Sequence, residues 1–240
     1  MKKRVIYSEI PFLLSLIIMS FAVAMLTAAN FGISMVVAPS YILSERIGFL
    51  SFGMAEYVVQ GMMFIIFCII VRKCRLIYFS SFVSCLLHGA FLDLFRVIIP
   101  LFNPNIVPAG SMSMWIRILL FIVGQQLLAA SVALGFKSYL LPQTNDFLVK
   151  AIADHFHKNV GTIKYIFDGL CLATALVMTL TIFGKLVGIG WGTFVLMLAN
   201  GFFIGKYSQL LDKIFSYRPL FPRFSRIYEE HGASPEIENS

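Results

Sequence analysis

Six apolar stretches in the sequence are each long enough to cross a lipid bilayer as a helix. They cover roughly residues 11–31, 52–71, 77–101, 114–136, 160–184 and 190–211. A spanning helix needs about 20 mostly apolar residues, and in lipid its backbone has to satisfy its own hydrogen bonds. Composition agrees, since 59% of the residues are apolar and 13% are charged, against roughly 45–50% and 25% in soluble domains. The sequence therefore predicts an all-α, polytopic membrane bundle of about six transmembrane helices.

The net charge of +7 comes from Lys and Arg residues that lie in short clusters between the apolar stretches. If the N-terminus is inside the cell, fourteen of these residues fall in segments on the cytoplasmic side and four on the outer side. Positive segments stay in the cytoplasm, so both termini are predicted to be cytoplasmic, and nucleic acid is not an expected partner. A cleaved signal peptide at the start is the alternative. It is disfavoured because the first span has a matching partner in the second half of the chain.

Three short patterns recur in the same order in the two halves of the chain. Gly32-x6-Pro39 matches Gly135-x6-Pro142, residues 53–61 match 161–169, and residues 88–91 match 200–203. Three spans per half is an odd number, so the second half has to enter the membrane from the opposite side. The prediction is two inverted three-helix repeats, a pattern found in transporters, with boundaries at 1–105, 106–212 and a cytoplasmic tail at 213–240.

The two Gly-x6-Pro segments are apolar but too short to span. Proline removes a backbone donor and glycine permits tight turns. Such a segment either lies along the interface as a loop and short helix, or enters the membrane partway while buried in protein. The sequence leaves both alternatives open for Gly32–Pro39 and for Gly135–Pro142.

Two motifs in the first half, NFGISMVVAPSYIL at 30–43 and SFGMAEY at 51–57, carry a likeness to a known group. They resemble the YczE/YyaS/YitT-like bacterial multi-pass membrane proteins, in particular an uncharacterised branch of that group. The likeness covers most of residues 10–210 and implies a bacterial cytoplasmic (inner) membrane. It supplies no substrate and no catalytic residue.

Polar groups from five of the six stretches fall near the same depth in the membrane when residues are counted from the span ends. These groups are Gln60, His88, Gln125, Asp168 and Asn200. Polar side chains inside a membrane are expensive and usually face a cavity or the bundle interior. The prediction is one internal cavity near the pseudo-two-fold axis that binds a small polar or cationic solute, with Glu56 and Lys164 as gates near its two mouths.

Structural roles remain open for several of these residues. The alternative role of His88 and Asn200 is a hydrogen bond between helices, and that of Lys164 and Asp168, four residues apart on one helix, is to neutralise each other. Asp93 has Arg96 three residues on as a pairing partner.

Sequence motifs for catalysis are missing, and the spacing of the cysteines and histidines does not match a metal site. The prediction is therefore a protein that is not an enzyme and has no cofactor. The leading function is a small transporter or permease that works by alternating access of the inverted repeats. The alternatives are a substrate-capturing membrane subunit of an ATP-driven importer and a non-transporting membrane scaffold or regulator. The expected partners are the lipid bilayer and a small polar solute, with a homodimer or a membrane partner subunit both left open.

Overall fold

A computed structural model describes residues 4–71, 79–140, 145, 148–149, 152–153, 156–158, 160–222 and 225. The basic loop at 72–75, Pro142 and the end of the predicted cytoplasmic tail from 226 lie outside the described residues.

The regular elements of the described chain are helices and two short strands. Its elements are β1 (Arg4–Tyr7), α1 (Glu9–Ala29), α2 (Ala38–Arg46), α3 (Phe52–Val71), α4 (Phe79–Ile98), the 3-10 turns η2 (Pro100–Phe102) and η3 (Ala109–Ser111), α5 (Met114–Gly135), α7 (Val160–Phe183), α8 (Trp191–Ile214) and β2 (Phe215–Arg218).

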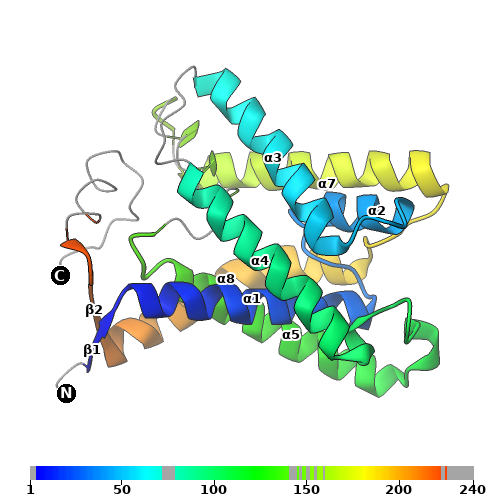
Figure 1. The fold of residues 1–240 in the computed structure, drawn as a ribbon, viewed down its shortest axis with the longest axis horizontal. Coiled ribbons are helices and arrows are strands. Elements are labelled where there is room, and N and C mark those ends of the chain that lie inside the picture. The colour runs from blue at the N-terminus through cyan, green and yellow to red at the C-terminus, as the bar shows by residue number, and fades with distance from the viewer. Residues whose placement is uncertain are drawn as a thin grey trace.

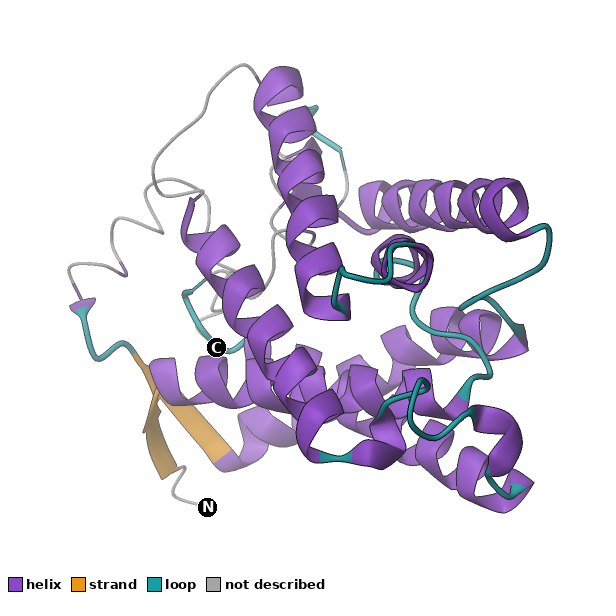
Figure 2. Cartoon of the chain, turned by 45° about the vertical axis from the view of Figure 1, so that its right-hand side comes forward, coloured by secondary structure: helices purple, strands orange, loops and turns teal. Residues whose placement is uncertain are grey.

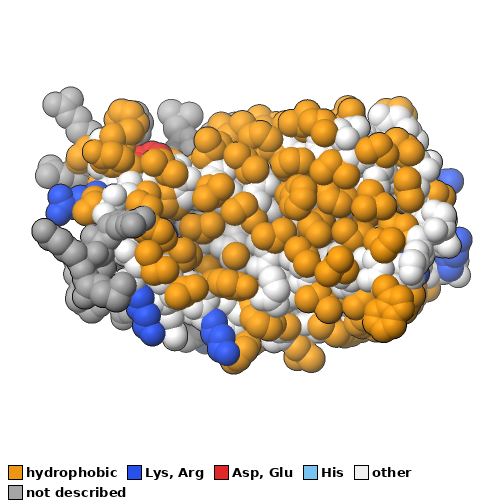
Figure 3. All heavy atoms as spheres, turned by 90° about the horizontal axis from the view of Figure 1, so that it is seen from below, with side chains coloured by type: hydrophobic (Ala, Val, Ile, Leu, Met, Phe, Trp, Pro, Cys, Tyr) orange, Lys and Arg blue, Asp and Glu red, His pale blue; other side chains and the backbone are white. Residues whose placement is uncertain are grey.

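Five helices are long and apolar enough to cross a membrane: α1, α4, α5, α7 and α8. Helix α3 has 20 residues, but the described apolar part of it, Phe52–Ile66, is shorter than a span. Hydrophobic side chains cover most of the face drawn in Figure 3, with Lys and Arg toward its ends. The predicted helical membrane bundle is therefore confirmed, while a sixth span and the inverted repeats stay predictions.

Helix α1 lies at the centre of one layer, where it packs along α5 and α4, and α5 packs on α8 (Figure 1). Small residues allow this close approach. Ala22 and Ala24 of α1 are fully buried and Ala28 is almost so. Gly124 of α5 faces Leu26 and the Ala22 carbonyl of α1. The core of the molecule is thus the seam between the first helix of each half of the chain.

The Gly32–Pro39 segment connects this layer to a second one formed by α2, α3 and α7, in which α2 packs on both others. Asn30 ends α1 in the left-handed conformation, Gly32 follows at φ +116°, and Pro39 lies in the first turn of α2. The Ile33 amide donates to the Gly188 carbonyl at 3.0 Å, and Ile33 and Ala38 are buried. The segment is therefore packed within the protein, as partial entry into the membrane would require, and whether it enters the membrane or lies along the interface stays open.

The two strands bring the two ends of the described chain together. Strand β1 pairs with β2 in parallel, and they lie side by side near the N-terminus (Figure 2). Glu9, at the start of α1, accepts hydrogen bonds from the Leu220 amide and from the Tyr139 hydroxyl. The start of α1 and the end of α8 are therefore on the same side of the molecule.

Candidate functional site

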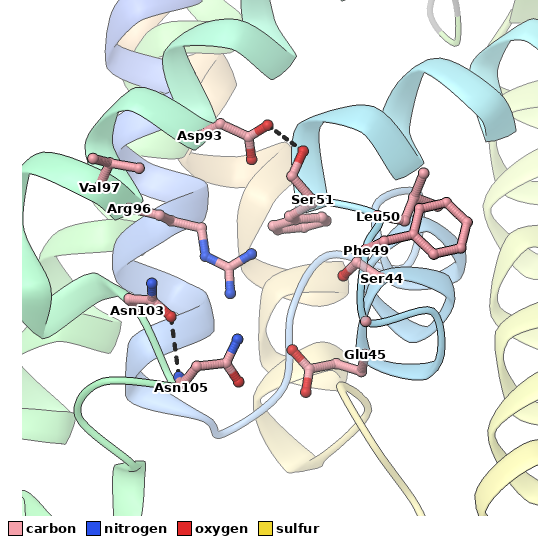
Figure 4. Close-up of a pocket in the computed structure, with 12 residues that line it drawn as sticks. Ser44, Glu45, Phe49, Leu50, Ser51, Asp93, Arg96, Val97, Asn103 and Asn105 are labelled. Atoms are coloured by element: carbon pink, nitrogen blue, oxygen red, sulfur yellow. Dashed lines mark hydrogen bonds between the residues drawn. The ribbon is translucent and has the colours of Figure 1, made fainter.

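A pocket of about 380 Å³ lies where the end of α2, the start of α3 and the end of α4 meet. Its polar lining comes from four separate segments, as Figure 4 shows. The polar residues used below are Glu45, Ser51, Asp93, Arg96, Asn103 and Asn105.

The upper wall of the pocket is the capped N-terminus of α3. Ser51 precedes the helix, and its hydroxyl accepts from the Met54 amide at 3.1 Å. Asp93 of α4 accepts from the Gly53 amide at 2.9 Å and from the Ser51 hydroxyl. A helix N-terminus has unsatisfied N–H groups and a partial positive charge, both of which a carboxylate satisfies. The carboxylate of Asp93 is therefore occupied by α3.

The pairing of Asp93 with Arg96, left open by the sequence, is not made among the described ion pairs and hydrogen bonds. Arg96 is 8% exposed and its Nε has no hydrogen-bond partner. Its guanidinium carbon lies 5.5 Å from the centre of the Phe52 ring. A guanidinium has five N–H donors in a planar fork and always carries its charge. This buried cation therefore faces the pocket with its donors available.

Glu45 lies across the pocket from Arg96 (Figure 4). The two charges both act on Tyr41 of α2. Burial raises the pKa of Tyr41 well above its ordinary value, and the Glu45 carboxylate raises the pKa further, whereas Arg96 lowers it. Opposite charges thus stand on opposite walls of one pocket without forming an ion pair with each other.

The residues predicted to line a midplane cavity lie elsewhere, and α3 carries the first of them. Gln60 and Glu56 are each 2% exposed, and the Gln60 amide donates to Glu56 Oε2 at 2.7 Å. Glu56 Oε1 and Gln60 Oε1 have no hydrogen-bond partner. Glu56, predicted as a gate, is therefore buried beside its neighbour on the same helix.

The other predicted residues form separate contacts. His88 is fully buried on α4, and its Nδ1 lies 2.8 Å from the Ser20 hydroxyl of α1. Gln125 of α5 donates to Asn200 of α8 at 3.4 Å.

On α7, Lys164 and Asp168 form an ion pair at 3.3 Å, which is the neutralising arrangement left open by their spacing. Among the described residues, the hydrogen bonds and ion pairs named above join these polar groups in separate pairs and not in one cluster. The single midplane cavity and the two gates stay predictions.

Arg96, Glu45, Asn103 and Asn105 were not among the predicted binding residues. One signal for Arg96 was in the sequence, because a cation inside an apolar stretch is a functional candidate by default. In the sequence, Asp93 offers Arg96 a pairing partner on the same helix, so Arg96 does not stand out as an unpaired charge. In the described part of the chain, no three His, Cys, Asp or Glu residues are grouped so that they could hold a metal ion.

Comparison with known proteins places the chain in a family without an assigned activity. No curated protein matches it, and no solved structure matches it. The more specific likeness to YczE/YyaS/YitT-like proteins therefore remains a resemblance. One family model matches residues 6–209, that of a "Family of unknown function (DUF6198)". The chain is a membrane protein that belongs to this uncharacterised family.

Proposed function

We propose that the protein is a small membrane transporter for a polar solute and that the pocket around Arg96 is a binding site for this solute. The observation that carries the proposal is the Arg96 guanidinium, 8% exposed and without a hydrogen-bond partner at Nε, in the wall of a pocket of about 380 Å³. Leaving a buried charge without a partner is costly. Small-molecule sites typically have volumes of about 300–1,000 Å³ and contain a few such convergent polar groups.

Alternating access of two inverted halves, 1–105 and 106–212, is the proposed mechanism. The recurring sequence patterns support it. The packing is consistent with it, because α1 packs on α4 in the first half, α5 packs on α8 in the second half, and α1 packs on α5 between them. The pairing of β1 with β2 also supports an even number of crossings, since it keeps the two ends on one side. With α3 as the sixth span, that number is six.

The competing functions differ in what else they require. A substrate-capturing subunit of an ATP-driven importer would use the same pocket but would co-purify with an ATPase. A scaffold or regulator is favoured by the separate polar pairs, such as Ser20 with His88, because these hold helices together without needing a solute.

Reconstitution into proteoliposomes tests the proposal directly. Uptake of a panel of labelled polar solutes is measured for the natural protein, for Arg96→Gln and for Arg46→Gln. Arg46 is an exposed arginine at the end of α2 that does not line the pocket, so its replacement removes the same charge nearby. We expect Arg96→Gln to lower uptake at least tenfold and Arg46→Gln to leave it unchanged. Normal uptake by a folded Arg96→Gln variant contradicts the proposal.

Topology is tested separately with reporter fusions. We expect both ends of the chain to be cytoplasmic and the turn around Asn103–Asn105 to face outward. Reporters that place the two ends on opposite sides of the membrane would mean an odd number of crossings and would rule out the inverted repeat.

A further inference from the structure

The charges around the pocket restrict the kind of solute that it accepts. Three charged side chains line it: Glu45, Asp93 and Arg96. Asp93 is occupied by the N-terminus of α3, where it accepts from the Gly53 amide and the Ser51 hydroxyl. The Arg96 guanidinium, without a partner at Nε, and the Glu45 carboxylate, which hydrogen-bonds the Tyr41 hydroxyl and forms no ion pair among the described residues, are the two charges left for a ligand to match.

Solutes that carry charge of a single sign fit this lining poorly. A dianion such as phosphate would gain Arg96 but would meet the carboxylates of Glu45 and Asp93, so the lining as a whole repels it. A simple cation would approach Glu45 but would leave the buried Arg96 guanidinium without a partner. A neutral sugar would satisfy neither charge. A solute that carries both charges and has no net charge satisfies both walls.

We propose that the pocket binds a small zwitterion of the amino-acid class, with its carboxylate on Arg96 and its ammonium group on Glu45. The inference rests on the proposed transport function for its biological meaning, although binding itself does not depend on transport. A guanidinium fork matches a carboxylate with two parallel hydrogen bonds, which a lysine cannot do. The Glu45 carboxylate oxygens accept hydrogen bonds from an ammonium group, which has three N–H donors.

The remaining lining suits the rest of such a molecule. Asn103 and Asn105 lie beside Arg96 (Figure 4), and Asn103 Oδ1 accepts from the Asn105 amide at 3.0 Å. That bond holds the Asn103 side chain in place next to the proposed carboxylate position. Leu50 and Val97 contribute apolar surface, which fits a short aliphatic side chain better than a charged one.

Binding is tested on the full-length protein in detergent or nanodiscs by thermal shift and calorimetry. The probes are the L-amino acids, each at millimolar concentration. Every amino acid that raises the melting temperature is then compared with two analogues, the decarboxylated amine and the deaminated acid. We expect both analogues to bind at least tenfold more weakly, because one leaves the buried Arg96 and the other leaves the partly buried Glu45 without a ligand group. The inference is overturned if no amino acid binds, or if either analogue binds as well as the zwitterion.

Variants of Arg96 and Glu45 test which charged group of the zwitterion each side chain binds. Arg96→Lys keeps the charge but loses the fork, and we expect at least tenfold weaker binding of the amino acids. Glu45→Gln should remove the preference for the zwitterion over the deaminated acid, while Arg46→Gln should bind as the natural protein does. Unchanged binding in both Arg96→Lys and Glu45→Gln overturns the assignment.

The outcome for the site and the outcome for the transport function are distinguishable. Amino-acid binding without any uptake into proteoliposomes removes the transport proposal and keeps the site. Uptake of another class of solute without amino-acid binding removes the site and keeps the transport proposal.

Discussion

The close crossing of α3 and α4 next to the pocket depends on Gly53. A Cβ atom added at Gly53 would lie 2.2 Å from the Gly89 carbonyl oxygen and 2.6 Å from Asp93 Oδ2. Real Cβ atoms essentially never approach another heavy atom within 3.0 Å. Because the first of these neighbours is backbone, a rotamer change cannot relieve the clash, and α4 itself has to move away from α3.

The cost of Gly53→Ala follows from two effects and one offset. Forcing extra volume into a packed contact costs about 1–3 kcal/mol. The same movement pulls Asp93 from the Gly53 amide, now at 2.9 Å, and loss of a helix cap costs about 0.5–2 kcal/mol. Replacing glycine by alanine in a helix returns up to about 1 kcal/mol. The net destabilisation is about 2 kcal/mol, or roughly 4–8 °C in melting temperature for a chain of this size.

Thermal unfolding in detergent, followed by intrinsic fluorescence, measures this effect. Gly61→Ala is the matched control, since it lies on the same helix and the nearest atom to its added Cβ is Phe82 Cε2 at 3.8 Å. We expect Gly61→Ala to melt at the natural temperature or slightly above it. If Gly53→Ala melts together with Gly61→Ala, the reasoning about the α3–α4 crossing is wrong.

Three further predictions concern polar groups away from the pocket. Ser20→Ala should destabilise by about 1–2 kcal/mol, because it leaves the buried His88 Nδ1 without its partner at 2.8 Å, and adding His88→Leu should recover part of the loss in the same melting assay. Lys164→Met alone should destabilise the protein by about 1–2 kcal/mol. Breaking a fully buried pair costs roughly 3–5 kcal/mol, and the cost is lower here because the side chain of the partner Asp168 is 17% exposed. The double variant with Asp168→Leu should restore the melting temperature, and if it also keeps full uptake, the pair has no transport role. Burial raises the pKa of Tyr217 to about 12, so the folded state favours the neutral phenol. Its contribution to stability is complete below pH 10 and is lost as pH rises toward 12. Tyr217→Phe should therefore lose less stability than the natural protein between pH 10 and 12 in a pH-dependent melting series.

The sequence by itself determined the parts of the molecule that depend on local chemistry. Apolar runs of about 20 residues become helices because a backbone in lipid has no other way to satisfy its hydrogen bonds, and five helices with span-forming length and composition are found where such runs occur. Gly32 and Pro39 marked the turn before α2. The spacing of Lys164 and Asp168 placed them on one helix face, where they form an ion pair.

Only the tertiary structure decided which polar groups meet. Counting residues along a span gives depth, but not the direction in which a side chain points around the helix axis, and each residue turns that direction by roughly 100°. His88 therefore meets Ser20 of α1, whereas Gln60 meets Glu56 four residues earlier on its own helix, a contact that the spacing alone allows. The pocket shows the same limit, because Asp93 turned to the N-terminus of α3 rather than to Arg96. Glu45 and Arg96 come from different helices, and only the packing of α2, α3 and α4 brings these two charges to opposite walls of one pocket.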